Sequence, residues 1–327
     1  MNLINQDHYF KFLNKNSEKC LSETYKNLYF LKLKIKKNIP KSNSNKQIKY
    51  LVDEIYEKKN IIYLNYFLVL LSTFISFKDS LKLLNVISYS KKNLTDYNVL
   101  EYIDNLNKKK NSTLSLGDKC SKQEFSFELI KNNLISFYKL KKNSKYLDIG
   151  CGDGYKTNIF AKILEINKKN IYGTDIPLWG PYQEKKDLSF DFKYILNNKL
   201  DYIDNSFDII TCFLTLHHIK NMDVILNEIK RVLKKNGIFI IIEHDCLNYF
   251  DNLIIDIQHL FFSYFNENRK DYIKDPSYAE YYNNMEFNYI LTEKYHYKLL
   301  FTENLYQNII RNKRYDQQFY AIYKNIK

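Results

Sequence analysis

The chain has 327 residues, of which 45% are apolar, so it can bury a sizeable core in one large or two medium domains. The net charge of +13 lies in the first half: residues 1–150 hold 27 lysines and 14 acidic residues, whereas residues 151–327 hold 23 basic and 23 acidic residues. The five scattered cysteines form no Cys-x-x-Cys pair, which argues against a disulfide framework and a cysteine-based structural zinc site.

The N-terminal part is predicted to be a basic, mainly helical region over residues 1–120. Tyr25–Ile39 fits an amphipathic basic helix, and apolar residues at 3- and 4-residue spacing predict two or three helices over residues 47–104. Asn105–Ser121 is rich in loop-forming residues, so we place the domain boundary there.

One segment raises the question of a membrane span. Ile61–Phe77 is 17 residues long without a charge, the lower limit for crossing a bilayer. Because it contains Asn65 and lies among other helical segments, we predict a buried core helix. Residues 1–20 have no apolar stretch of the signal-peptide kind, so the expected location is cytoplasmic.

Residues 121–327 alternate apolar strands with helices, which predicts an α/β fold: a doubly wound sheet of seven strands covered on both faces. The predicted strands are Lys145–Ile149, Asn170–Thr174, Phe190–Leu196, Phe207–Phe213, Ile238–Ile242, Tyr297–Phe301 and Phe319–Tyr323. The predicted helices are Phe127–Leu140, Tyr155–Ile166, Asn221–Leu233 and Tyr249–Phe265.

A glycine-rich turn follows the first strand, in a chain with only seven glycines. It reads Leu147-Asp148-Ile149-Gly150-Cys151-Gly152-Asp153-Gly154. Such a turn lets the backbone approach a ligand closely, but the pattern is Gly-x-Gly-x-Gly and not the dinucleotide fingerprint. Carboxylates at Asp148 and Asp153 would repel a pyrophosphate and suit a ligand with an ammonium and a sulfonium. The turn therefore favours S-adenosylmethionine over a dinucleotide.

A second acidic residue stands at cofactor spacing. Asp175 ends the second strand, 25 residues after Gly150, where a carboxylate can accept hydrogen bonds from both ribose hydroxyls of an adenosyl group. A structural cap of the strand end is the alternative reading.

Titratable residues follow two later strands, at the edge where the transferable methyl group would lie. His217 and His218 come after the fourth strand, and either could serve as a general base. Glu243-His244-Asp245 comes directly after the fifth strand, and Asp256 and His259 share one face of the next helix. A structural hydrogen-bond network, substrate binding with proton transfer, and a metal site are all open for this group. Our predicted catalytic residues are His218, Glu243 and His244, with no metal.

These motifs together resemble class I, Rossmann-like, S-adenosylmethionine-dependent methyltransferases over residues 122–327, most specifically at Leu147–Gly154, Asp175 and Ser206–Ile219. The resemblance implies a seven-stranded sheet with an antiparallel last strand. It also implies contacts to adenine from Asn197 or Asn198. Residues implied to contact the cofactor are Asp148, Gly150, Cys151, Gly152, Gly154, Asp175, Ile176, Asn197, Phe213 and Leu214. Glu243–Asp245 together with Asp256–His259 is also similar to methyltransferase-like proteins of large DNA viruses, for which the location would be the host cytoplasm.

The acceptor is less determined than the cofactor. The basic N-terminal half slightly favours RNA or another polyanion, although the absence of arginine before Arg231 argues against base reading. A small-molecule or lipid methyltransferase and a non-catalytic binding or stimulatory subunit are the alternatives. The Lys-Asp-Lys-Glu tetrad of cap ribose methyltransferases is not evident, because the fourth strand ends in Thr211-Cys212-Phe213.

Overall fold

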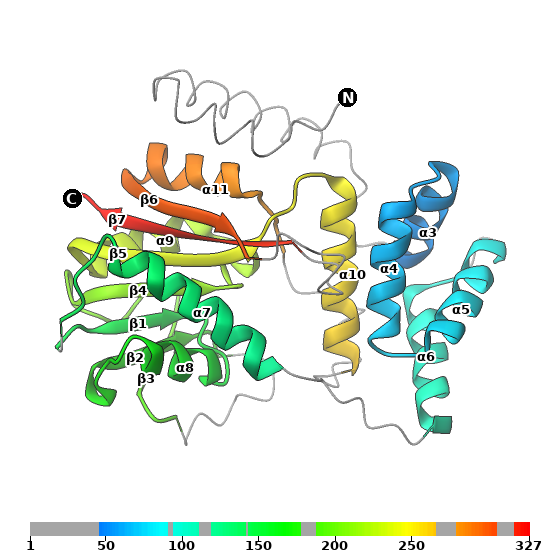
Figure 1. Ribbon diagram of the computed structural model, residues 1–327, viewed down its shortest axis with the longest axis horizontal. Helices are drawn as coiled ribbons and strands as arrows, with labels where there is room; N and C mark the ends of the chain where they lie inside the picture. Colours follow the sequence, from blue (N-terminus) through cyan, green and yellow to red (C-terminus); the bar gives the residue numbers. More distant parts are fainter. Residues whose placement is uncertain are drawn as a thin grey trace.

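The computed structural model describes residues 46–90, 94–110, 119–141, 143–177, 188–265, 279–305 and 317–327; the predicted helix Tyr25–Ile39 lies outside them. Figure 1 shows a sheet with helices on its faces and, beside it, a group of helices, with one long helix standing between the two parts.

The sheet has seven strands in the order β3-β2-β1-β4-β5-β7-β6, which confirms the predicted doubly wound α/β fold. Neighbouring strands from β3 to β5 are parallel, whereas β7 is antiparallel to both β5 and β6. The strands are β1 (Tyr146–Ile149), β2 (Ile171–Asp175), β3 (Asp191–Tyr194), β4 (Phe207–Phe213), β5 (Leu233–His244), β6 (Tyr297–Asn304) and β7 (Gln318–Asn325).

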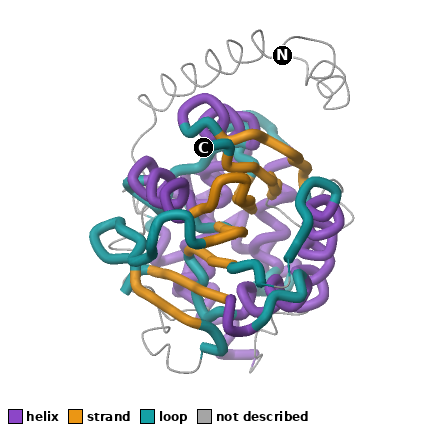
Figure 2. The backbone as a smooth tube through the Cα atoms, turned by 90° about the vertical axis from the view of Figure 1, so that its left-hand side faces the viewer, coloured by secondary structure: helices purple, strands orange, loops and turns teal. Residues whose placement is uncertain are grey.

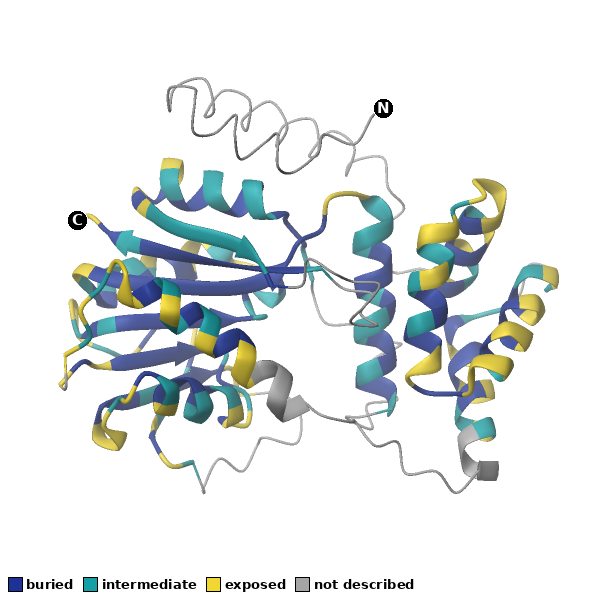
Figure 3. Ribbon diagram, viewed as in Figure 1, coloured by how far each residue is buried: buried dark blue, intermediate teal, exposed yellow. Residues whose placement is uncertain are grey.

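Helices cover both faces of the sheet, because its central strands are apolar on both sides (Figures 2 and 3). On one face, α7 (Lys119–Ile135) and α8 (Tyr155–Ile163) share a core with the strands. On the other face lie α9 (Met222–Val232), α11 (Asn284–Tyr289) and the adjoining π-helical turn η5 (Ile290–Lys294). Short 3₁₀ turns, η1 (Lys168–Asn170) and η3 (Leu216–His218), precede β2 and follow β4.

The second part, here called the helical unit, has five helices among the described residues, packed around one apolar core. They are α3 (Gln47–Glu57), α4 (Ile61–Ser72), α5 (Phe77–Tyr89), α6 (Asp96–Lys110) and α10 (Tyr249–Phe265). The first four belong to the predicted N-terminal region, but α10 is inserted between β5 and the strands that complete the sheet. The helical unit is therefore built from two separate stretches of the chain, which the sequence did not predict.

The two faces of α10 differ in chemistry. Leu253, Ile257 and Phe261 lie in the core of the helical unit. Asp256 and His259 instead hydrogen-bond to Tyr281, which shares a small core with Cys246 from just after β5 and Ile255 of α10. The helix thus presents an apolar face to the helical unit and a polar pair toward the sheet.

Several predicted boundaries were wrong. α6 extends to Lys110 and α7 begins at Lys119, so the loop between the two parts is shorter than Asn105–Ser121, and α7 ends at Ile135 instead of Leu140. β5 is 12 residues long because Leu233 already pairs with Phe207, and the strand continues through the polar residues 234–237, where the register with β4 shifts, to Ile238. Within the described residues no helix is long and apolar enough to cross a membrane. α4 has Phe67, Leu70 and Leu71 in the core, which confirms the predicted core helix.

Candidate functional site

The turn after β1 has left-handed backbone at the positions where its sequence has glycine. Gly150 has a φ of +73°, and a Cβ there would lie 2.3 Å from the Thr215 side chain. Gly152 has a φ of +55°, and a Cβ there would meet nothing within 4 Å. Gly150 therefore allows the β4 turn to approach, whereas Gly152 leaves open space beside the backbone.

Asp175 fastens this turn to the end of β2. Its Oδ2 accepts a hydrogen bond from the Gly152 amide at 2.8 Å, and its Oδ1 accepts one from the Ile176 amide at 2.8 Å. A carboxylate has further lone pairs to offer a ligand. Asp175 is thus both a support of the glycine turn and an acceptor at its edge.

Asp148 lies beneath the turn and is 2% exposed. Its oxygens accept hydrogen bonds from the hydroxyls of Thr157 on α8 at 2.5 Å and of Thr211 on β4 at 2.6 Å. Burial raises the pKa of Asp148 to about 6, and the two hydroxyl groups oppose that rise. Asp148 therefore joins β1, β4 and α8, which places the glycine turn.

A cleft of about 510 Å³ opens at the carboxyl ends of β1, β2 and β4, the position where ligands bind in open α/β sheets. Its lining residues are Gly150, Cys151, Gly152, Asp153, Tyr155, Lys156, Asp175, Ile176, Ile195, Asn198, Phe213, Leu214, Thr215, His218, Ile219, Lys220 and Ile225.

Seven of the predicted cofactor residues line this cleft, namely Gly150, Cys151, Gly152, Asp175, Ile176, Phe213 and Leu214. Asp148 and Gly154 do not: Asp148 is turned into the sheet, and Gly154 forms the N-cap of α8. Asn197 does not line the cleft either; of the two asparagines that the sequence offered for the adenine contact, Asn198 lines it. Both asparagines have left-handed backbone, at φ of 53° and 56°, in the tight turn before β4.

Sequence reasoning missed three polar residues of the cleft, Lys156, Thr215 and Lys220. Lys156 follows the glycine turn in the first turn of α8, and Lys220 follows the histidine pair. Their nearness to motifs already identified was the available signal. No lysine of the described part of residues 1–149 lines the cleft.

Of the predicted catalytic residues, only His218 lines the cleft. Glu243 is fully buried behind it and accepts hydrogen bonds from the Thr215 and Leu216 amides at 3.0 and 2.7 Å. It also accepts one from His217 Nδ1 at 2.6 Å. Burial raises the pKa of Glu243 to about 7. Glu243 thus fixes the turn that carries the histidine pair and does not face the cleft.

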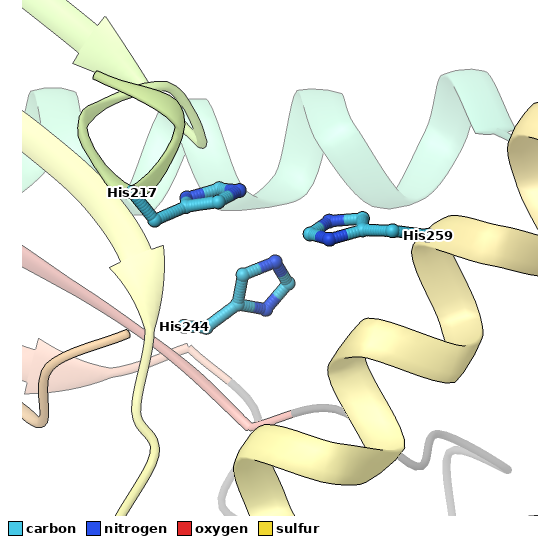
Figure 4. A group of neighbouring side chains, drawn as sticks. All are labelled: His217, His244 and His259. Carbon is cyan, nitrogen blue, oxygen red and sulfur yellow. The ribbon is translucent and has the colours of Figure 1, made fainter. Parts of the chain in front are cut away.

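His244 is also buried behind the cleft, within a group of imidazole rings. Figure 4 shows His217 from the turn after β4, His244 from the end of β5 and His259 from α10 pointing toward one another. The ring centroids of His217 and His244 are 5.0 Å apart, and those of His217 and His259 are 5.3 Å apart. Burial holds the pKa values of His217 and His259 well below the usual range, so His217 meets Glu243 as a neutral hydrogen-bond donor.

The residues of the cleft fit the adenosyl and amino-acid parts of S-adenosylmethionine. Because Gly152 has no side chain, the space beside its backbone is open to a ligand, and the Asp175 carboxylate lies next to this backbone. A seven-stranded sheet in this order, with the glycine turn after β1, defines a class I, Rossmann-like methyltransferase fold. Residues 147–241 match the family described as "Methyltransferase domain", so this segment is a methyltransferase domain.

Further similarities are partial. Residues 97–174 match the family of protein-L-isoaspartate(D-aspartate) O-methyltransferases. The sterol 24-C-methyltransferase ERG6B of Gibberella zeae is 32% identical over 117 residues, 35% of this chain and 31% of the relative. The ubiquinone biosynthesis O-methyltransferase of Pelagibacter ubique is 29% identical over 124 residues, 34% of this chain and 49% of the relative. The chain thus spans less than half the length of either relative.

Among solved structures, a SAM-dependent methyltransferase from Aquifex aeolicus overlaps 63% of this chain and 94% of its own, with 18% identity and a TM-score of 0.42. The YcgJ protein of Bacillus subtilis overlaps 61% of this chain and 97% of its own, with 19% identity and a TM-score of 0.40.

Proposed function

We propose that this chain is an S-adenosylmethionine-dependent methyltransferase that acts on an acceptor carrying anionic groups, with RNA or another polyanion as the favoured class. The observation that carries the first part is the cleft formed by the glycine turn and Asp175 at the carboxyl edge of the sheet.

Each side of the cleft has a task in this proposal. The open backbone at Gly152 receives the cofactor, and Asp175 accepts hydrogen bonds from its ribose hydroxyls. Phe213 and Leu214 provide an apolar wall. S-adenosylmethionine supplies a methyl group on a sulfonium, and the protein contributes alignment and exclusion of water.

His218 is our candidate for the general base. It lines the cleft at the end of η3, and the turn that carries it is held by the three hydrogen bonds to Glu243. A nitrogen or oxygen acceptor must lose a proton upon methylation, and a positioned imidazole can take it. Glu243 supports this residue as a positioning residue in the buried layer behind it.

The anionic acceptor is supported by Lys156 and Lys220, which line the same cleft. Their charge offsets that of the Asp153 and Asp175 carboxylates in the same lining and so lessens the repulsion of an anionic acceptor. The lysines of the described helical unit are not part of this lining, so a role for the basic N-terminal half would be to hold a long polyanion outside the cleft.

Two alternatives are distinguished by assay. The relatives named for sterol and ubiquinone methylation favour a lipid or small-molecule acceptor, whereas a stimulatory subunit would bind the cofactor without turnover. Transfer of a radiolabelled methyl group into RNA, lipid and small-molecule extracts separates the three. Label in RNA supports the proposal, and label in lipid alone overturns the acceptor class.

His218 is tested with His218→Gln on whichever acceptor takes label. We expect kcat to fall about 10²–10⁴-fold, the usual contribution of a general base, with unchanged affinity for the cofactor. The matched control is His296→Asn, an exposed histidine outside the cleft whose left-handed backbone suits asparagine. An unchanged kcat in His218→Gln would exclude it as the base.

Salt dependence tests the polyanion. Each phosphate contact to a single strand contributes about 0.7 to the slope of log K against log salt. Lys156→Gln with Lys220→Gln should therefore lower the slope for RNA by about 1.4 in filter binding, and an unchanged slope would show that these lysines do not contact phosphate.

A further inference from the structure

We propose that His217, His244 and His259 bind a divalent metal ion of the zinc type, each through one imidazole nitrogen (Figure 4). This site adjoins the cofactor cleft, but it does not depend on the proposed methyl transfer. Histidine, cysteine and acidic side chains are the usual ligands of such an ion, and among the described residues these three histidines have ligand atoms close enough to share one.

The spacing of the three nitrogens suits a site that closes on its ion. All three ligand atoms lie within 4.8 Å of one another. A tetrahedral zinc site with bonds of about 2.0–2.1 Å needs nitrogens about 3.3 Å apart. Small movements of the imidazole rings bring the ligands from the first spacing to the second. His217 and His244 are buried and His259 is half-buried.

His217 is already oriented as a metal ligand. Its Nδ1 lies 2.6 Å from Glu243 Oε2, and the tautomer in which Nδ1 donates to this carboxylate has its lone pair on Nε2. Nε2 is buried and has no hydrogen-bond partner among the described residues. A buried imidazole nitrogen in that position costs free energy unless something binds it. A carboxylate on the far nitrogen is also the usual support of a metal-bound histidine.

His259 has a comparable support from its own side. The Tyr281 hydroxyl donates to Asp256 Oδ1 at 2.8 Å, so its oxygen can accept from His259 Nδ1, 2.9 Å away. This chain fixes the tautomer of His259 with the lone pair on Nε2. Asp256 and His259 lie three residues apart on α10, so the same face of the helix carries the ligand and its support.

Three imidazoles favour zinc, or a neighbouring transition metal, over magnesium and calcium, which prefer oxygen ligands. A tetrahedral ion held by three histidines keeps a fourth position. The His218 ring lies 4.1 Å from that of His217 and 4.9 Å from that of His259, and His218 also lines the cleft. The ion would therefore join β4, β5 and α10 directly behind the wall of the cleft.

The primary test is zinc binding by the untagged full-length protein. Calorimetry and elemental analysis after dialysis should give one Zn²⁺ per chain, and Co²⁺ in its place should give the visible absorption of a tetrahedral site. His259→Gln should lose this binding, while His296→Asn, which changes an exposed histidine, should retain it. Equal zinc content in these two variants would overturn the proposal.

A second variant separates metal binding from folding. Tyr281→Phe removes the oxygen that supports His259 and keeps the ring. It should weaken zinc binding about 10–100-fold, as is usual when such a supporting group is lost. Circular dichroism of the metal-free proteins shows whether the variants fold. A wild-type chain that binds no Zn²⁺ or Co²⁺ stoichiometrically would mean that the histidines form only a packed hydrogen-bonded group, and the proposal would be wrong.

Discussion

Gly152 is the position where a single side chain should block the cleft with little effect on folding. Its backbone is left-handed, which asparagine tolerates better than most residues, and a Cβ there meets no atom within 4 Å. Gly152→Asn should therefore fold normally and lower the affinity for S-adenosylhomocysteine at least tenfold, about 1.4 kcal/mol.

Calorimetry measures this affinity, and thermal unfolding checks the fold. Ile203→Asn serves as the control, because Ile203 is 83% exposed and lies outside the cleft. Unchanged affinity in Gly152→Asn would mean that the cofactor does not occupy the space beside this glycine.

At the same scale, the sequence predicted the glycine turn and Asp175 because local spacing determines them. It did not predict that Asp148 turns away from the cleft, since that depends on Thr157 and Thr211 from two other elements. Asn197 and Asn198 are equivalent in sequence, and only the turn geometry decides which one lines the cleft.

Among the elements, α3 and α6 meet through a buried carboxylate. Asp96, the first residue of α6, accepts hydrogen bonds from the amides of Gln47 at 3.0 Å and Ile48 at 2.9 Å, at the start of α3. Burial raises the pKa of Asp96 from 3.8 to about 6, against the effect of those two amides. The folded state thus holds this proton more tightly than the unfolded state.

The stability of the folded state should therefore fall as the pH rises past the pKa of Asp96. The contribution of Asp96 to stability is fully present below pH 3.8 and is lost as the pH rises through 6, by about 3 kcal/mol in total. Asp96→Asn removes this loss but gives up one acceptor, which costs about 1 kcal/mol.

Urea unfolding of Asp96→Asn and wild type at pH 4 and pH 7 measures both effects. The variant should be the less stable protein at pH 4 and the more stable one at pH 7, because the wild type loses about 3 kcal/mol over this range and the variant gives up only about 1 kcal/mol. Asp53→Asn, a change of a surface residue in α3, is the control. A difference that stays constant with pH would contradict the burial of an ionisable Asp96.

The strands were predictable because continuous apolar runs such as Ile238–Ile242 must be buried on both faces, as they are in a sheet covered by helices. The start of α7 was not, because the described helix begins in a polar stretch that reads as a loop. α11 has only six residues, too few for an apolar period to be visible, although its capping box of Asn283 and Glu286 was a signal.

For the whole molecule, α10 makes the helical unit and the sheet depend on each other. Phe261 is fully buried in the core of the helical unit, with its ring 5.3 Å from that of Phe74. Phe261→Ala should lower the free energy of unfolding by about 3–5 kcal/mol. Tyr89→Ala, at an 85% exposed position of α5, should change it by less than about 0.5 kcal/mol.

Denaturant titration followed by circular dichroism measures both variants. Loss of less than about 1 kcal/mol in Phe261→Ala would show that α10 does not hold the helical unit together. The sequence predicted α10 as a helix and grouped His259 with Glu243–Asp245, but it did not predict that His217 joins them or that the other face of α10 packs on α3 to α6, because tertiary packing alone decides both.

The insertion of α10 between β5 and β6 also has a consequence for synthesis on the ribosome. α10 begins 139 residues after the end of α6 (249 − 110), so α3 to α6 leave the ribosome well before it, and domains tend to fold in the order of their synthesis. Until α10 emerges, the apolar side chains that will contact Leu253 and Phe261 lack their cover. The nascent N-terminal helices should therefore be a preferred target of chaperones that bind exposed apolar surface, and slow translation before residue 249 should lengthen that exposure.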